Sequence, residues 1–421
     1  MNAHPLDSAD PLAPLRERFY LPAGAPVYLD GNSLGLLSRD AEASVQRALD
    51  EWKTLAIGGW LDGAPPWFTL AEDLAARVAP LVGAGPGEVA VTNSTTVNLH
   101  QLLATLYQPA GGRTKIVAYD GEFPSDLYAI KSHLRLRGVD PEEGLLLVPP
   151  GPDRLLDQGA LTRALDDPAV ALAVLPAVVY TTGELLDLRA ITAQAGTRGV
   201  LVGFDLSHSV GVVPHRLAED GVDFAFWCHY KYLNAGPGAV GGLFLHARHA
   251  DRLPGLAGWW GSNKTAQFNM SSELHPAGGA GGLQVGTPPI LGLAALGGAL
   301  DIVEEAGIVQ IRKKSLALTA YLTMLLCAPQ LAVHGFDFAN PAENHRRGGH
   351  ISLVHPEAAR ICRALKDAGV ITDYRPPDIV RFAPVPLYNT FADCEAAAER
   401  LSEIMAARAY ENYPSERALV P

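Results

Sequence analysis

Short apolar runs alternate with stretches of helical periodicity through the middle of the chain. The runs have the length and composition of buried strands, and polar residues or glycine bound them. They lie at 88–93, 115–120, 171–180, 200–205, 222–228 and 239–246. Helical patterns follow the first three of these runs at 95–107, 125–138 and 188–199. This alternation predicts an α/β domain with a mostly parallel sheet, in which ligands bind at the carboxyl ends of the strands.

The two ends of the chain are more helical. Apolar positions recur at helical spacing over 39–55 and 70–83, and again over 291–307 and 312–327, before a final stretch that mixes strand-like and helical segments. We therefore expect three parts. They are an N-terminal segment (1–70) that joins the small domain, a large α/β domain (71–315) and a C-terminal small α+β domain (316–421).

Composition narrows the class of protein. The 421 residues are 48% hydrophobic and 19% charged, so the chain can bury a sizeable core. Lys and Arg number 33 against 45 Asp and Glu, a formal net charge of −12, which argues against a nucleic-acid or anionic-membrane partner. No apolar run is long enough to span a membrane, and no signal-peptide pattern precedes the first helix. We expect a soluble, cytoplasmic protein.

Asp205 and Lys231 each follow an apolar run, on consecutive predicted strands. Alone, the carboxylate is as well explained by an N-cap or a structural ion pair, and the lysine by a solvated strand end. A lysine flanked by Tyr230 and Tyr232 in so apolar a setting is nevertheless unusual, because burial disfavours its charged form. Together the two groups suit pyridoxal phosphate (PLP), which requires an amine for its aldehyde and an acid for its ring nitrogen.

Two other strand ends carry groups that suit the same cofactor. The segment NSTT (93–96) opens a helix, where hydroxyl and free N–H groups bind phosphate, although alone it reads as an N-cap cluster. The segment FPSD (123–126) offers an aromatic ring and a carboxylate, although Phe-Pro before a helix is more often a packing device. No single element is decisive, but their order along the chain, each at a strand end, indicates a PLP site.

The sequence resembles the kynureninase family from about Tyr28 to Ile404. The stretch 202–238 is typical of this family and not of PLP enzymes at large. The resemblance implies the aspartate-aminotransferase-like fold (PLP fold type I), with a mostly parallel seven-stranded sheet. It also implies hydrolysis of L-kynurenine to anthranilate and L-alanine in tryptophan catabolism, which can lead to NAD precursors. The segments that carry it are YLDGNSLGLL (28–37), NSTTVNLH (93–100), GEFPSDLYAI (121–130), VGFDLSHSVG (202–211), VDFAFWCHYKYLNAGPG (222–238), GWWG (258–261), GTPPILGL (286–293) and VRFAPVPLYNTF (380–391).

The resemblance also implies roles for individual residues. Lys231 would bond to the cofactor aldehyde and, once freed, remove the substrate α-proton. Asp205 would keep the ring nitrogen protonated, with Asp126 in support, and Tyr230 would be the acid/base partner in later proton transfers. The remaining cofactor-binding residues would be Thr95 and Thr96 at the phosphate together with Tyr230, Phe123 stacked on the ring beside Pro124 and Ser125, and His208 at the ring edge.

The resemblance implies that the remaining residues bind the substrate or belong to the site of a second subunit. Trp259 and Thr287 would complete the phosphate site of a neighbouring subunit, so the active form would be a homodimer with shared sites. Arg381 would hold the substrate α-carboxylate, a task suited to a planar fork of donors. Trp60 and Gly286 would face the aromatic ring and offer no partner to a ring hydroxyl, which predicts a preference for L-kynurenine over 3-hydroxykynurenine.

The chain departs from the family pattern at three places. Ala177 stands where relatives often carry a hydroxyl residue, so one hydrogen bond near the cofactor is in doubt. The segment GAPPW (63–67) differs from the family's RPW-like segment before the first large-domain helix. Trp60 occupies a position that is His in the animal enzymes.

Three alternatives stay open at the level of sequence. An aminotransferase or a cysteine desulfurase would share the fold, but a desulfurase needs an exposed cysteine on a mobile loop. A nicotinamide oxidoreductase is disfavoured because no G-x-G-x-x-G opens a helix after the first strand. A binding protein without chemistry would not need the four residues Asp205, Tyr230, Lys231 and Arg381. We see no metal-ligand spacing and expect no metal. The four cysteines, too scattered for a disulfide framework, are Cys228, Cys327, Cys362 and Cys394.

Overall fold

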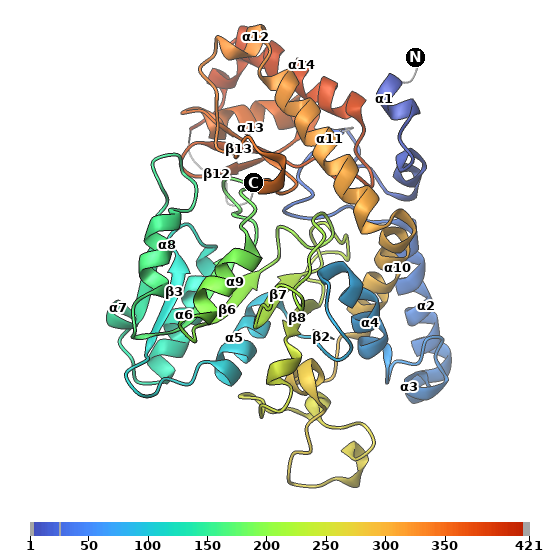
Figure 1. The fold of residues 1–421 in the computed structure, drawn as a ribbon. Coiled ribbons are helices and arrows are strands. Elements are labelled where there is room, and N and C mark those ends of the chain that lie inside the picture. Colours follow the sequence, from blue (N-terminus) through green and yellow to red (C-terminus); the bar gives the residue numbers. More distant parts are fainter. Residues whose placement is uncertain (1–3, 25–26, 416–421) are drawn as a thin grey trace.

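A seven-stranded sheet forms the centre of the molecule, which a computed structural model describes over residues 4–24 and 27–415 (Figure 1). The strand order is β2-β8-β7-β6-β5-β3-β4. Strand β8 runs antiparallel to both of its neighbours, and the other pairs are parallel. The predicted α/β fold with a mostly parallel sheet is thus confirmed. The strands are β2 (Val89–Val91), β3 (Lys115–Tyr119), β4 (Leu145–Val148), β5 (Val170–Pro176), β6 (Leu201–Asp205), β7 (Phe224–Cys228) and β8 (Gly241–Leu245).

Helices cover both faces of this sheet, which explains why its strands read as continuous apolar runs. Alternate residues of one strand enter different cores: Ile116 and Ala118 of β3 lie in one cluster, and Val117 and Tyr119 in another. The first cluster includes side chains of α5 (Thr95–Leu106) and α6 (Pro124–Leu136). The second includes side chains of α4 (Leu70–Val82), α8 (Gln158–Leu165), α9 (Leu188–Gly196) and α10 (Ile290–Ala306).

The C-terminal part has its own core. It lies above the large sheet in the view of Figure 1. Its antiparallel sheet has the order β12-β13-β10-β9. Side chains of the surrounding helices fill the same core. The elements are α11 (Ile308–Leu326), β9 (Asp337–Phe338), β10 (Ile351–Val354), α13 (Ala358–Asp367), β12 (Asp373–Arg375), β13 (Ile379–Phe382) and α14 (Phe391–Ala406). A small α+β unit at this end of the chain matches the sequence prediction.

The N-terminal segment contacts both parts of the molecule. Strand β1 (Val27–Tyr28) pairs in parallel with β11 (Val370–Ile371) of the C-terminal part. Helix α2 (Arg39–Leu55) instead packs along α10 on the large part. Shorter helices are α1 (Pro5–Ser8), α3 (Gly59–Asp62), α7 (Pro141–Gly144) and α12 (Pro329–Ala332). The domain boundaries at 70/71 and 315/316 stay a prediction.

Helix α4 shows how a local signal fixes an element's end. Gly83 follows the helix with a φ of 63°, the left-handed conformation that glycine adopts without strain. A Cβ at this position would lie 2.4 Å from the carbonyl oxygen of His215, so the packing also requires glycine. Among the described residues, no helix is both long and apolar enough to cross a membrane. The cytoplasmic location stays a prediction.

Candidate active site

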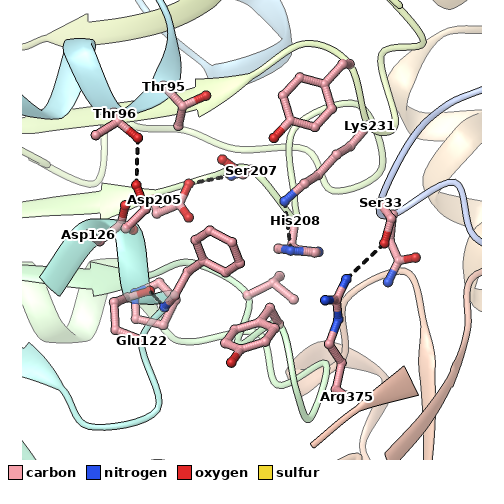
Figure 2. Close-up of a pocket in the computed structure, with 17 residues that line it drawn as sticks. Ser33, Thr95, Thr96, Glu122, Asp126, Asp205, Ser207, His208, Lys231 and Arg375 are labelled. Atoms are coloured by element: carbon pink, nitrogen blue, oxygen red, sulfur yellow. Dashed lines mark hydrogen bonds between the residues drawn. The ribbon is translucent and has the colours of Figure 1, made fainter. Parts of the chain in front are cut away.

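A cavity of about 190 Å³ lies at the carboxyl ends of the sheet strands (Figure 2). Its lining comes from the segments after β2, β3, β5, β6 and β7, and from two segments distant in sequence, at 32–33 and at Arg375. This is the position expected for a ligand in an open α/β sheet. The lining residues are Asn32, Ser33, Thr95, Thr96, Glu122, Phe123, Ser125, Asp126, Pro176, Val178, Tyr180, Asp205, Ser207, His208, Tyr230, Lys231 and Arg375.

Lys231 reaches across the cavity toward His208. Its Nζ lies 2.8 Å from Nε2 of the imidazole, and Figure 2 shows this contact as a dashed line. Burial, together with the positive charge of Lys231, lowers the pKa of His208 well below its usual value. The imidazole is therefore neutral at neutral pH, and its Nε2 can accept a hydrogen bond from the amine.

Three carboxyl groups gather at one end of the cavity. Asp205 ends β6 and accepts a hydrogen bond of 2.8 Å from the N–H of Ser207. Asp126 in the first turn of α6 and Glu122 just before it each place an oxygen within 4.8 Å of the others. Burial raises the pKa of each of the three groups, and the charge of Lys231 opposes that shift at Asp205 and Asp126.

The N-terminus of helix α5 borders the cavity on the same side as Asp205 and Asp126 (Figure 2). Thr95 and Thr96 form its first turn, and the Ser94 side chain makes no capping hydrogen bond to it. The hydroxyl of Thr96 lies 2.6 Å from that of Ser125 on α6. A Cβ on Gly241 of the adjacent strand would lie 3.0 Å from the N atom of Thr95, so glycine permits the close approach. Free N–H groups and clustered hydroxyls at a helix N-terminus make an anion site.

Aromatic side chains close the sides of the cavity. Phe123 is 44% exposed and meets the Tyr180 ring edge-on at 5.6 Å. Tyr230 precedes Lys231 in the segment after β7. Burial raises the pKa of the Tyr230 phenol above its usual value, so the group keeps its proton over the physiological range.

Two arginines lie near the cavity in different environments. Arg375 lines it, and its Nη2 donates to Ser33 Oγ at 3.1 Å and to Asp373 at 2.6 Å. Arg381 is fully buried behind the lining. It donates through Nε to Asp373 at 2.7 Å, through Nη1 to the carbonyl oxygen of Tyr180 at 2.8 Å, and through Nη2 to Ser33 and Asp373. Asp373 thus joins the two guanidinium groups.

Besides Arg381 and Pro124, four predicted residues are not part of the cavity lining. Trp60 is half-buried, with its ring 5.9 Å from that of Trp67 and 5.5 Å from that of Trp260. Trp259 is 41% exposed. It belongs to the segment between β8 and α10, which extends from the large part at the bottom of Figure 1. Gly286 and Thr287 are exposed further along the chain. Within one described chain, these residues do not come together with Lys231.

Other predicted positions support the lining. Pro124 is the first residue of α6 and presets the turn that presents Ser125 and Asp126. Ala177 is fully buried and donates its N–H to the carbonyl oxygen of Asp205 at 2.8 Å. In the segment 63–67, Trp67 donates to Glu51 at 3.0 Å.

Sequence reasoning missed several lining residues. Glu122 precedes the FPSD segment, and a carboxyl group beside an apolar segment was the available signal. Ser33 lies in the YLDGNSLGLL segment, which was recognised without a role for its polar residues. Arg375 gave no signal, because it comes from another part of the fold. Cys327, which follows α11, is exposed but does not line the cavity. The other three cysteines are buried.

Comparison with solved structures identifies the fold. A cysteine desulfurase of Escherichia coli superposes with a TM-score of 0.78 at 19% sequence identity, covering 96% of this chain and 99% of that chain. The cystine C–S lyase C-DES, in complex with cysteine persulfide, gives a TM-score of 0.75 at 18% identity, covering 90% and 98%. The chain therefore shares the fold of these proteins, PLP fold type I, and its lysine-centred cavity lies at the carboxyl ends of the strands.

Comparison with curated proteins narrows the class to one family. Kynureninase of Geobacillus thermodenitrificans (strain NG80-2) is 50% identical over 418 residues, which cover 99% of this chain and 97% of the relative. Kynureninase of Bacillus cereus (strain ATCC 10987 / NRS 248) is 49% identical over 414 residues, 98% and 96% of the two chains. A family model described as the kynureninase C-terminal domain matches residues 311–401. The chain belongs to the kynureninase family, PLP-dependent hydrolases that act on carbon–carbon bonds.

Proposed function

We propose that the protein hydrolyses the Cβ–Cγ bond of L-kynurenine to give anthranilate and L-alanine, with PLP held in the cavity around Lys231. The observation that carries this proposal is the grouping of Lys231, His208 and the carboxyl cluster in one cavity of a chain about half identical to named kynureninases. A cysteine desulfurase would in addition need an exposed cysteine near the site, and no cysteine of the described residues lines the cavity.

The lining fits the parts of the cofactor. Thr95 and Thr96 at the N-terminus of α5, with Ser125 of α6, suit its phosphate, and Tyr230 lines the same cavity. Asp205 and Asp126 suit a protonated ring nitrogen, and Asp126 Oδ2 has no hydrogen-bond partner among the described residues. Phe123 suits the ring face. When bound, PLP supplies an aldehyde for the lysine amine and a ring that withdraws electrons from the substrate α-carbon.

Lys231 accepts the first proton, and His208 positions the lysine amine. The amine of Lys231 removes the proton from the substrate α-carbon, and the neutral imidazole of His208 holds Nζ in place through their 2.8 Å contact. Tyr230 retains its phenolic proton and can donate it as the later bonds rearrange. Each of these groups lines the same cavity, within reach of one bound substrate.

The paired arginines bind the substrate α-carboxylate. The sequence predicts Arg381 for this role, but its N–H groups already donate hydrogen bonds to Asp373, Ser33 and the carbonyl oxygen of Tyr180. Arg375 faces the cavity and leaves its Nε without a partner among the described residues. We propose that Arg375 receives the carboxylate together with Arg381, and that Asp373 between them fixes both guanidinium planes.

A homodimer with shared sites is the proposed active form. Trp259 and Thr287 lie exposed and away from their own chain's cavity, as residues that serve a partner would. Phe268 and Met270, on the same projecting segment, are 68% and 73% exposed. Large exposed apolar side chains gathered on one segment are typical of an interaction surface.

The direct test is to incubate the protein and PLP with L-kynurenine and follow anthranilate by its fluorescence. We expect anthranilate and alanine in equal amounts. Release of sulfide from cysteine, or amino-group transfer to a keto acid, with no anthranilate formed, would overturn the proposal. A Lys231→Ala variant is the control that separates enzymatic turnover from the reaction of free PLP.

A further inference from the structure

Glu122 belongs to the cofactor site without an assigned role. It lies between β3 and α6, its side chain is buried, and it lines the cavity beside Asp126 and Asp205. One carboxylate oxygen of each residue lies within 4.8 Å of those of the other two. Figure 2 shows the group on the side of the cavity away from Arg375.

The hydrogen bonds around Glu122 leave one oxygen unused. Its Oε1 accepts a bond of 3.1 Å from the N–H of Phe123. Its Oε2 has no hydrogen-bond partner among the described residues, and the same holds for Asp126 Oδ2. Asp205 differs, since it accepts from Ser207. The two unpartnered oxygens therefore belong to neighbouring carboxyl groups in a fully buried setting.

Three negative charges so close together cannot all persist in a buried site. Lys231 is the cation that acts on the cluster, and it favours the charged forms of Asp126 and Asp205. The groups that act on Glu122 are Asp126 and Asp205, which repel its charge, and the Phe123 N–H, which favours it. The Tyr119 phenol on β3 is nearby, and burial keeps it neutral. Two carboxyl groups that share a site in this way hold one proton between them.

We propose that Glu122 is a positioning residue that shares one proton with Asp126, bridging their two unpartnered oxygens and orienting Asp126 toward the cofactor ring. This proposal depends on the proposed function only in that PLP is taken to bind in this cavity. Asp205 then keeps its charge for the ring nitrogen, because the neighbouring pair carries one negative charge instead of two. Glu122 acts through Asp126 and does not touch the reacting atoms.

Two variants distinguish this role from its alternatives. Glu122→Gln keeps the shape and a hydrogen-bond donor without an ionisable proton, whereas Glu122→Leu keeps bulk and removes both. We expect cofactor-free Glu122→Gln to bind PLP within about threefold of the parent at pH 7. Glu122→Leu should bind about 10-fold more weakly or worse, because Asp126 loses a hydrogen bond to a charged group. Absorbance titration of the cofactor-free protein with PLP measures both, and Asp120→Asn is the matched control at an exposed carboxylate.

Three results would overturn the proposal. Equal weakening in Glu122→Gln and Glu122→Leu would mean that Glu122 acts as a charge. Unchanged binding in Glu122→Leu would mean that it only fills space, and tight binding of a divalent cation by the cofactor-free parent would assign the cluster to a metal. None of these titrations uses kynurenine, so they stand apart from the test of the proposed reaction.

Thermal unfolding gives a second readout if Glu122→Leu does not fold. Burial raises the pKa of Glu122 in the folded chain, so its contribution to stability is complete below the unfolded pKa and is lost as pH rises through the folded pKa. The cofactor-free parent should therefore lose more stability between pH 5 and pH 9 than Glu122→Gln does. Parallel losses in the two proteins would contradict a shared proton.

Discussion

The amine of Lys231 and the imidazole of His208 lie 2.8 Å apart, although they follow different strands of the sheet. Strands β6 and β7 are adjacent and parallel, so the segments that follow them emerge at the same edge. The neutral imidazole holds the amine without competing for a proton, because the pKa of His208 is well below its usual value. The contact orients the lysine toward the cavity.

We expect Lys231→Ala to abolish turnover and leave the fold intact, because Lys231 forms no ion pair with another described residue and its contact with His208 lies at the cavity surface. Reduction of the PLP-loaded parent with borohydride, followed by peptide mapping, should place the pyridoxyl label on Lys231. A label on another lysine would contradict the assignment. Lys115, which is paired with Asp167 at 2.8 Å on the far end of β3, serves as the control position.

Asp205→Asn should lower kcat by about 10- to 150-fold, the worth of one hydrogen bond to a charged group. The loss can be larger, because electrostatic stabilisation by the Asp205 carboxylate is strongest in the transition state. Steady-state kinetics and the absorbance of bound PLP measure the two effects separately. Asp223→Asn is a useful control, because Asp223 is also buried but pairs with His249 at 2.7 Å instead of lining the cavity. Near-normal turnover in Asp205→Asn would contradict its role.

The sequence alone predicted those elements whose bounds are determined by one local pattern. The helical patterns at 39–55 and 70–83 became α2 and α4 with almost the same ends, since capping by Ser38 and a left-handed Gly83 are local. The strand ends after β3, β6 and β7 likewise placed Asp126, Asp205 and Lys231 around one cavity, because parallel strands share an edge.

The rest of the site depends on contacts that no local pattern encodes. Arg375 and Ser33 lie more than 300 residues apart and meet at 3.1 Å only because β1 pairs with β11 and carries the N-terminal segment over the cavity. The buried state of Arg381 similarly depends on Asp373 across the β12–β13 pair, with which it is in register. Family resemblance supplied Arg381, but only the assembled fold reveals Arg375 beside it.

Arg375 and Arg381 should respond differently to loss of charge. Arg375→Gln should raise KM for kynurenine and lower Tm less than Arg381→Gln does, because Asp373 then keeps Arg381 as its partner. Arg381→Gln leaves Asp373 buried with a weaker partner, and breaking such a buried pair costs about 3–5 kcal/mol. Its Tm should therefore fall as well as its activity. Arg375→Lys, which keeps the charge without the planar fork, should recover part of the lost affinity. A stable Arg381→Gln with normal KM would contradict this division.

Subunit exchange tests the shared site. If Thr287 serves the partner's phosphate site, a dimer of Lys231→Ala with Thr287→Ala contains one site with an intact lysine and an intact threonine. Mixing the two inactive variants under exchange conditions should thus restore activity above that of either alone. Lys231→Ala mixed with Asp205→Asn is the matched control, because both changes damage a subunit's own cavity and no intact site forms. A fully active monomer in sedimentation would rule out the shared site.

Substrate preference depends on the residues proposed to face the aromatic ring, Trp60 and Gly286. A hydroxyl that loses water and finds no partner costs about 1–3 kcal/mol. L-Kynurenine should therefore exceed 3-hydroxykynurenine by about 10- to 100-fold in kcat/KM. Trp60 also packs on Trp67 and Trp260, so the alternative is that it only supports these rings.

Two variants separate these roles of Trp60. Trp60→His combined with Gly286→Ser supplies donors to a ring hydroxyl, and should narrow or reverse the preference while retaining kynurenine turnover. Trp52→His, at a side chain that is 61% exposed, is the control for adding a histidine to the same region of the chain. If Trp60 serves only as packing, the double variant loses stability and activity toward both substrates equally. Equal kcat/KM values for the two substrates in the parent would also contradict selection at these positions.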